Sequence, residues 1–425
     1  MMNAQSTRVE LLAPAGNFEK LCIAVDYGAD AVYLADRRFS LRNAADNFTV
    51  EQIARAVAYA GEHDVRLYVA CNIYPRTGEE KPIAEYLGEL GQIGPDAIII
   101  ADPGILMMAR ELLPDMPIHL STQANTTSLK AVRFWERQGV SRVNIARELS
   151  LVEINEIAAG CNTEIEAFVH GAVCIAYSGR CLLSAFLSGR ESNRGLCSHP
   201  CRWRYHVTEE KRAGQFMPIE TTKRGSFIFN ALDLCMIEHV DKMIAAGISA
   251  LKIEGRMKSV HYLAATVHTY REAIDTYYDS PEEYRVKDRW RRTLASVTSR
   301  GYSTNFYFGY PGPESINSTD TRPPLEVVFI AQVLVQAALP DRTLVKVKNK
   351  FFVGDAVEIL SPGRPVRKDT ILRIYDADGI PQEFAQPNSV VSLQLGKKCY
   401  PRDMIRRIES TASGATENPV GDRNG

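Results

Sequence analysis

The sequence predicts a (β/α)8 barrel followed by a small β-barrel domain. Eight short, apolar, β-branched runs alternate with amphipathic helical segments between residues 11 and 254. Such alternation predicts a parallel sheet with buried strands, and eight units favour a closed TIM-like barrel over an open doubly wound sheet. Beyond residue 326 the apolar pattern changes to a period of two, which indicates short antiparallel strands.

Helical segments such as FEKLCIAVDYGA and LVEINEIAAG separate the expected barrel strands. The strands are LLAPA (11–15), AVYLA (31–35), RLYVA (66–70), AIIIA (97–101), IHLST (118–122), RVNIA (142–146), EAFVH (166–170) and ALKIE (250–254). In this class of barrel the active site lies at the carboxyl ends of the strands. Polar residues follow the strands at those ends, including Gln123, Arg147, His170, Glu254 and Arg256.

The connection between the seventh and eighth strands is exceptionally long. It spans residues 171–249, whereas such connections usually contain about two to six residues. It includes two strand-like pieces, RYHVTE (204–209) and GSFIFN (225–230). It also contains five cysteines, Cys174, Cys181, Cys197, Cys201 and Cys235. We expect an insertion over the mouth of the barrel, with Cys235 opening the helix CMIEHVDKMIAAG.

The same patterns divide the chain into four parts. The barrel and its insertion occupy residues 1–278, a linker covers 279–325, and a small β-barrel domain covers 326–410. Six short strands are expected in that domain: VVFIAQVLVQ, TLVKVKNK, DAVEIL, TILRIY, SVVSLQL and MIRRIE. The tail, 411–425, is small and polar, so we expect it to be disordered.

Composition and charge limit the possible partners. The chain has 425 residues, a formal net charge of −1 and a pI of about 6.7, so no overall field attracts nucleic acid or an anionic membrane. We find neither a signal-peptide pattern nor an apolar run near the roughly 20 residues of a membrane span. We therefore expect a cytoplasmic protein without membrane contact, in which clustered cysteines more often bind metal or do redox chemistry than form disulfides.

The cysteine spacing favours a metal or cluster site over scattered structural thiols. Zinc sites usually bring ligands in close pairs, and only Cys197 and Cys201 form such a pair. Iron–sulfur clusters are held by four thiolates and tolerate wider spacings. The expected helix start at Cys235 would favour its thiolate form. The remaining cysteines lie in apolar contexts typical of inert core residues, and they are Cys22, Cys71, Cys161 and Cys399.

Several motifs resemble those of the collagenase-like peptidase family, class U, family thirty-two. They are ELLAPAGNFEKL, DAVYLADRRFSLR, LSTQANTT, IARELSL, VHGAVCIAYSGRCLLS, NRGLCSHPCRWRY, NALDLC and LKIEGRMKS. The resemblance covers about residues 9–410, and it is closest to the family's prephenate-dependent tRNA hydroxylation proteins. It implies a role in making 5-hydroxyuridine at the tRNA wobble position. Related members hydroxylate a cytidine of 23S rRNA, or ubiquinone precursors without oxygen.

The resemblance also implies a cofactor and a hydroxyl donor. Relatives hold a 4Fe–4S cluster on four cysteines, which correspond here to Cys174, Cys181, Cys197 and Cys235. Cys201 is a fifth candidate, and the sequence does not decide between it and Cys235. The implied donor is prephenate, a small dicarboxylate, which requires fixed cations in its site.

Candidate substrate residues follow from that chemistry. Arg42, Arg147 and Arg256 are candidates to hold carboxylates, although each is also compatible with a surface salt bridge. Gln123 follows the fifth strand and is a further substrate-binding candidate. His170 and Glu254 end strands seven and eight and are candidates to move protons, with a buried core histidine as the alternative for His170.

An RNA contact requires a local basic surface, and the insertion contains one. Between residues 180 and 204 there are five arginines and one acid, Glu191. Arginines beside exposed aromatic rings suit single-stranded bases. We therefore expect tRNA contacts from Arg194, Arg202, Trp203 and Arg204. The alternative places Trp203 and Tyr205 on the buried face of a hairpin.

Two other functional classes remain open at this point. A peptidase would require a nucleophile with a base, and Cys174 lies four residues after His170, but neither an HExxH nor a GxSxG motif is present. A non-catalytic RNA-binding scaffold with a structural cluster is the third class. The sequence carries no signal of oligomeric state.

Overall fold

The computed structural model describes residues 8–40, 46–203, 230–317, 325–336 and 342–409. The chain forms two compact units, Met1–Pro323 and Pro324–Gly425. The expected pieces at 204–209 and 225–229 and the expected disordered tail lie outside the described residues, as do Arg42 and Arg204. Within the described ranges, no helix is long and apolar enough to cross a membrane.

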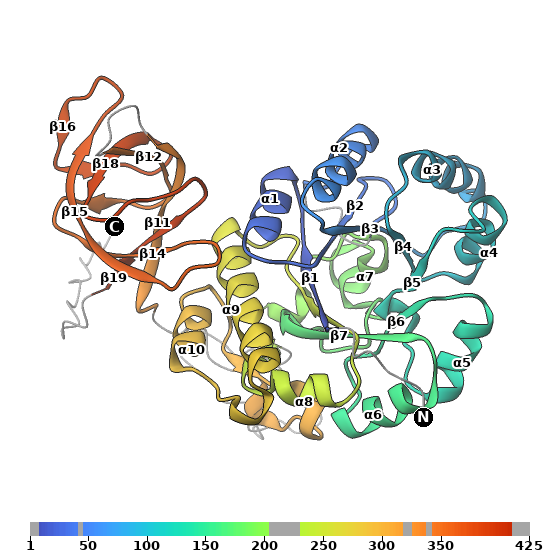
Figure 1. The fold of residues 1–425 in the computed structure, drawn as a ribbon. Helices are drawn as coiled ribbons and strands as arrows, with labels where there is room; N and C mark the ends of the chain where they lie inside the picture. The colour runs from blue at the N-terminus through green and yellow to red at the C-terminus, as the bar shows by residue number, and fades with distance from the viewer. Residues whose placement is uncertain (1–7, 41–45, 204–229, 318–324, 337–341, 410–425) are drawn as a thin grey trace, which may run out of the picture. The chain divides into compact units, whose positions relative to one another are not determined.

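The first unit is the expected eight-stranded parallel barrel (Figure 1). It closes because β9 pairs in parallel with both β1 and β7. All eight predicted strands are confirmed. They are β1 (Glu10–Pro14), β2 (Ala31–Ala35), β3 (Arg66–Cys71), β4 (Ala97–Ile100), β5 (Ile118–Leu120), β6 (Arg142–Asn144), β7 (Glu164–Gly171) and β9 (Ala250–Ile253).

Helices surround the barrel, and side-chain caps mark where many of them begin. They are α1 (Phe18–Asp26), α2 (Val50–Gly61), α3 (Glu80–Ile93), α4 (Pro103–Leu112), α5 (Leu129–Arg137), α6 (Leu151–Gly160), α8 (Val240–Ala245) and α9 (Val260–Asp279). Thr49 and Ser150 form capping boxes with Gln52 and Glu153, satisfying amide groups that a helix start leaves unpaired. The strand–helix boundaries therefore follow from local sequence.

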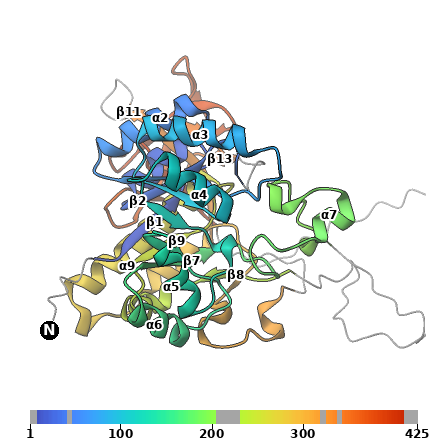
Figure 2. The same cartoon turned by 90° about the vertical axis from the view of Figure 1, so that its right-hand side faces the viewer.

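The insertion after β7 lies at one end of the barrel. Its described part contains the short helix α7 (Leu183–Ser188) and the strand β8 (Asp233–Cys235). Figure 2 shows α7 standing beyond the end of the barrel, outside the ring of helices. Cys235 does not open a helix as expected. It ends β8, which runs antiparallel to the end of β7, and α8 begins only at Val240.

The segment expected to be a linker is largely part of the first unit. It forms the helix α10 (Asp288–Ala295) and the strand β10 (Tyr302–Ser303), which pairs with β8. Trp290 is 1% exposed, so α10 is anchored by a buried aromatic ring. Arg289, Arg291 and Arg292 occupy the exposed side of this amphipathic helix.

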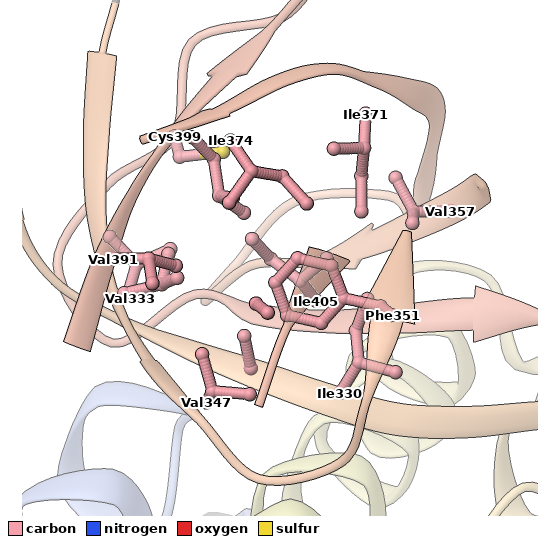
Figure 3. Packing of buried hydrophobic residues seen from close by; sticks show 14 of the residues in the cluster. Ile330, Val333, Val347, Phe351, Val357, Ile371, Ile374, Val391, Cys399 and Ile405 are labelled. Carbon is pink, nitrogen blue, oxygen red and sulfur yellow. The ribbon is translucent and has the colours of Figure 1, made fainter. Parts of the chain in front are cut away.

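The second unit is a closed antiparallel barrel of six strands, as predicted. Its order is β14–β19–β11–β12–β18–β15, and β15 closes the barrel on β14. These strands are β11 (Val327–Gln336), β12 (Arg342–Val347), β14 (Ala356–Leu360), β15 (Arg367–Tyr375), β18 (Val390–Leu395) and β19 (Met404–Ile408). Shorter strands are β13 (Phe351–Phe352), β16 (Pro381–Gln382) and β17 (Phe384–Ala385). Ile330, Phe351 and Ile405 are among the apolar residues filling its interior (Figure 3).

A cysteine-lined candidate active site at the barrel mouth

A cavity of about 280 Å³ lies where the insertion meets the carboxyl ends of the strands. The insertion supplies thiols, and the ends of β5, β6 and β9 supply polar side chains. Its chemically active lining residues are Gln123, Arg147, Cys174, Cys181, Cys197, His199, Cys201, Arg202, Glu254 and Lys258. The expected position of the functional site therefore coincides with a concave, polar and thiol-rich space.

A second cavity, of about 40 Å³, lies within the mouth of the barrel itself. Tyr33, Asn72, Lys252 and Arg256 are among its lining residues. Three residues line both cavities: Gln123, Arg147 and Glu254. A ligand in the larger space would therefore contact the same side chains that reach into the barrel.

Four of the five candidate cysteines line the larger cavity, and Cys235 does not. The pKa of the Cys201 thiol is raised by burial, and the neighbouring thiols act in the same direction. Cys235 lies outside the cavity, and its Sγ is 3.9 Å from the hydroxyl of Tyr270. Burial raises the pKa of the Cys235 thiol to about 11. Cys235 nevertheless pairs with His170 at the end of β7, just before the loop that bears Cys174.

The thiols do not form a ready site for a single ion. Within the described ranges, no three Cys, His, Asp or Glu side chains converge closely enough to hold a metal ion. A 4Fe–4S cluster places its four thiolates further apart than one ion does, so thiols spread around a cavity are the donor set that it requires. The backbone amide of His199 already donates a 3.4 Å bond to Cys197 Sγ, a contact that tunes cluster ligands.

Glycines and serines hold the cysteine loop against the barrel. Gly179 has φ +75°, and a Cβ there would lie 2.9 Å from the Tyr74 hydroxyl and 3.1 Å from Gln123 Cγ. Ser198 Oγ contacts the hydroxyls of Ser184 and Ser188 at 3.0 and 2.7 Å, linking α7 to the loop of Cys197 and Cys201. These contacts fix thiols that are far apart in sequence around one space.

Three cations line the cavity. The guanidinium of Arg147 lies 3.9 Å from the Phe168 ring and donates to the Ala172 carbonyl at 2.9 Å. The buried Nε atoms of Arg147 and Arg202 have no hydrogen-bond partner among the described residues. Burial lowers the pKa of Lys258, although its Nζ lies 3.8 Å from the carboxylate of Asp233. Half-buried cations with unused donors are suited to an anionic ligand.

Glu254 and Arg256 lie at the boundary of the barrel. The Tyr33 hydroxyl donates to Glu254 Oε2 at 3.1 Å, and Glu254 lines both cavities. Arg256 is 5% exposed, donates to Ser40 Oγ at 2.9 Å and lines only the smaller cavity. Arg256 is therefore farther inside than Arg147.

His170 lies behind the site rather than in it. It is 1% exposed, lines neither cavity and is surrounded by the rings of Tyr262, Tyr270 and Tyr302. Burial lowers its pKa to about 3, so it is neutral at physiological pH. His170 is therefore a buried core histidine. It does not line either cavity, so it is not placed to carry protons as expected.

The residues expected to contact RNA lie in three different environments. Arg194 donates to both carboxylate oxygens of Glu79, at 3.0 and 2.6 Å, which already neutralises much of its charge. Arg202 faces the cavity, and burial together with the charge of Arg300 lowers its pKa. Trp203 is 40% exposed, so it does not lie on a buried hairpin face.

Sequence reasoning missed Lys258. It lies two residues after Arg256 in the motif LKIEGRMKS, and its position after the eighth strand was a usable signal. Gly255, with φ +154°, turns the chain so that Lys258 faces the cavity. Because a side chain at Gly255 would collide with Tyr262, this turn depends on glycine.

Comparisons with known proteins agree with this architecture. The family described as "Peptidase family U32" matches residues 16–317, and its C-terminal domain matches residues 326–406. "tRNA hydroxylation protein P1" of Bacillus subtilis is 40% identical over 94% of this chain and 94% of its own. "tRNA hydroxylation protein P" of Escherichia coli is 36% identical over 83% and 86%, and "Collagenase" of Porphyromonas gingivalis 28% over 94% and 98%. The chain belongs to peptidase family U32.

Proposed function

We propose that this chain is a tRNA-modifying enzyme that hydroxylates the wobble uridine to 5-hydroxyuridine without oxygen. It would use a 4Fe–4S cluster and prephenate as hydroxyl donor. The observation that carries the proposal is the cavity where thiols and half-buried cations meet at the barrel mouth. The names of relatives at 34–40% identity support tRNA hydroxylation as the activity.

The cysteines of the insertion would hold the cluster. Cys174, Cys181 and Cys197 belong to both alternative ligand sets, and the fourth ligand is either Cys201 or Cys235. Cys201 lines the cavity together with the other three, whereas Cys235 does not, and burial raises the pKa of both thiols. When bound, the cluster supplies one-electron redox chemistry.

The cations would hold the donor's two carboxylates. Arg147 and Arg202 line the cavity, and each has a buried Nε–H group with no partner among the described residues. Lys258 also lines it, with its Nζ 3.8 Å from the carboxylate of Asp233. Charge-assisted contacts from these cations would stabilise the two carboxylates in a partly desolvated space, and Glu254 and Asp233 offset part of the positive charge. Arg256 would complete this set from inside the barrel.

Glu254 is the residue positioned to exchange a proton with the substrate. Glu254 lines both cavities, and its carboxylate accepts a hydrogen bond from Tyr33. Removing the proton from C5 of the uracil ring would require a base within hydrogen-bond reach. His170 is not available for that role, because it lies outside both cavities.

The peptidase alternative rests on the relative named collagenase. The sequence offers His170 as the base for a cysteine peptidase built on Cys174. His170 does not line the cavity that contains Cys174, and its Nδ1 faces the Tyr270 hydroxyl at 3.4 Å. His170 is therefore not placed to act as a base for Cys174, and His199, which lines the same cavity, is the histidine that a peptidase would have to use.

The test of this function is the nucleoside content of tRNA from cells that lack the chain. We expect mass spectrometry to show loss of 5-hydroxyuridine and its derivatives, and their return with the wild-type gene. Unchanged 5-hydroxyuridine in the deletion strain would contradict the proposal. Cleavage of gelatin by the pure protein, lost on Cys174→Ala, would favour the peptidase.

A further inference from the structure

The second unit has an outward-facing pair of aromatic rings. In the ladder of β13 and β17, Phe351 pairs with Ala385 and Phe352 pairs with Phe384. Successive side chains of a strand point to opposite faces. Phe351 and Ala385 accordingly enter the core (Phe351 is labelled in Figure 3), whereas Phe352 and Phe384 are 44% and 40% exposed.

A lysine lies over both exposed rings. Lys350 Nζ is 4.9 Å from the centroid of the Phe352 ring and 4.4 Å from that of Phe384. The two centroids are 6.0 Å apart with a 54° angle between the rings. Among the described residues, no carboxylate pairs with the Lys350 ammonium group. The arrangement is a preformed aromatic platform that carries a positive charge.

The chain around this platform is basic. Lys346 and Lys348 precede Lys350 at alternate positions, and neither has a carboxylate partner in the described part of the chain. The carboxylate of Asp355 is already engaged, because it accepts from the Phe352 amide at 2.8 Å and lies 3.9 Å from Arg407. Glu383, the exposed residue beside Phe384, offsets one of these charges, so three lysines against one carboxylate leave the surface with a net positive charge.

We propose that the platform of Lys350, Phe352 and Phe384, with Lys346 and Lys348 in the segment that leads into it, binds unpaired nucleotides of the tRNA. The inference rests on the proposed function, which makes tRNA the polyanion that the chain meets. Bases stack on exposed aromatic rings while lysines neutralise the adjacent phosphates. A chain with a net charge of −1 has to bind RNA through local patches of this kind.

The test uses the full-length protein and tRNA from cells that lack it. Truncating both rings in Phe352→Ala/Phe384→Ala should weaken tRNA binding about 5- to 150-fold, the range typical of a lost stacking contact. Phe352→Trp/Phe384→Trp should keep binding near wild type, because indole rings also stack. Lys350→Gln should flatten the dependence of log affinity on log salt concentration by about one unit.

Matched controls lie on the same unit. Leu372, which is 49% exposed, and Lys368 are outside the proposed surface, so Leu372→Ala and Lys368→Gln should bind tRNA as the wild type does. An unpaired RNA oligonucleotide should compete with tRNA, and a duplex of equal length should compete less well.

The outcomes separate this inference from the proposed function. If the Phe352→Ala/Phe384→Ala protein bound tRNA as tightly as the wild type, the surface would not be an RNA site, even with 5-hydroxyuridine formed normally in cells. Equal weakening by Leu372→Ala would also overturn it, since the effect would then not be local. Absence of 5-hydroxyuridine formation with intact tRNA binding would instead contradict only the proposed function.

Discussion

At the scale of single residues, burial decides which candidates can act. Arg147 and Arg202 line a cavity and each keeps a buried Nε–H group without a partner among the described residues, whereas His170 is enclosed by tyrosine rings and remains neutral. The sequence placed all three near the site, because strand ends and loop motifs are visible in it. It did not reveal the direction in which each side chain points, which depends on packing between elements distant in sequence.

Arg147→Gln should weaken binding of the dicarboxylate donor. Losing a charge-assisted contact costs about 2–4 kcal/mol, or roughly 30- to 1,000-fold in affinity. Titration of the purified protein with prephenate measures the change, and the iron content should stay constant. Arg137→Gln removes an exposed arginine at the end of α5 and is the matched control. Equal prephenate affinity in both variants would remove Arg147 from the site.

His119 should make the protein less stable in mild acid. It is 7% exposed, its Nδ1 has no partner among the described residues, and burial together with Arg142 lowers its pKa well below the usual value. Below pH ~6.5 the His119 side chain is therefore protonated in the unfolded chain, whereas it stays neutral in the folded chain. The free energy of unfolding is therefore lost as pH falls, by about 1.4 kcal/mol per unit.

Urea unfolding at pH 7 and pH 5 tests this effect. His119→Phe should lose about 2 kcal/mol less than the wild type between the two values. The exposed His63 is the control, since His63→Phe should follow the wild type. Parallel losses in the wild type and His119→Phe would show that His119 does not carry the effect.

At the scale of elements, local signals predicted the strands and missed the insertion's internal structure. The eight apolar runs became strands because each is buried on both sides, and burial needs only a continuous apolar pattern. Cys235 was expected at a helix start because an amphipathic pattern follows it. Instead, pairing with the end of β7 extends this segment as β8, and such a long-range contact has no local signature.

Gly179→Ala should loosen the cysteine loop. Both Gly179 and Gly189 have positive φ, so alanine adds similar backbone strain of about 1 kcal/mol at either position. Only Gly179 faces close neighbours, whereas a Cβ at Gly189 would meet nothing within 4 Å. We expect anaerobically purified Gly179→Ala protein to contain less iron and sulfide than Gly189→Ala protein. Equal cluster content would show that the contact with Tyr74 does not hold the loop.

At the scale of the whole molecule, the chain combines a (β/α)8 barrel, a fold in which active sites are common, with a β-barrel unit that carries a basic surface. The division near residue 324 followed from the change of hydrophobic period, which the sequence displays directly. The boundary of the first unit was less visible, because β10 joins it by pairing with β8. The sequence predicted where the cavity lies but not which side chains line it, since these come from segments up to 135 residues apart, from Gln123 to Lys258.

Replacing single cysteines should identify the cluster ligands. Loss of Cys174, Cys181 or Cys197 should remove the brown colour and most of the approximately four irons per chain expected of a 4Fe–4S cluster. Of Cys201 and Cys235, the one whose loss has the same effect is the fourth ligand. Cys22 and Cys399 are buried core residues, and their replacement by alanine should leave the colour intact.

The most direct measurement is the 5-hydroxyuridine content of tRNA from a deletion strain grown without oxygen and complemented with defined variants. The wild type should restore the nucleoside fully. Cys174→Ala should fail because it lacks the cluster, and Arg147→Gln should fail or fall sharply while its purified protein keeps the cluster. Full restoration by Cys174→Ala would contradict the account, since the cluster would then not be required for the modification.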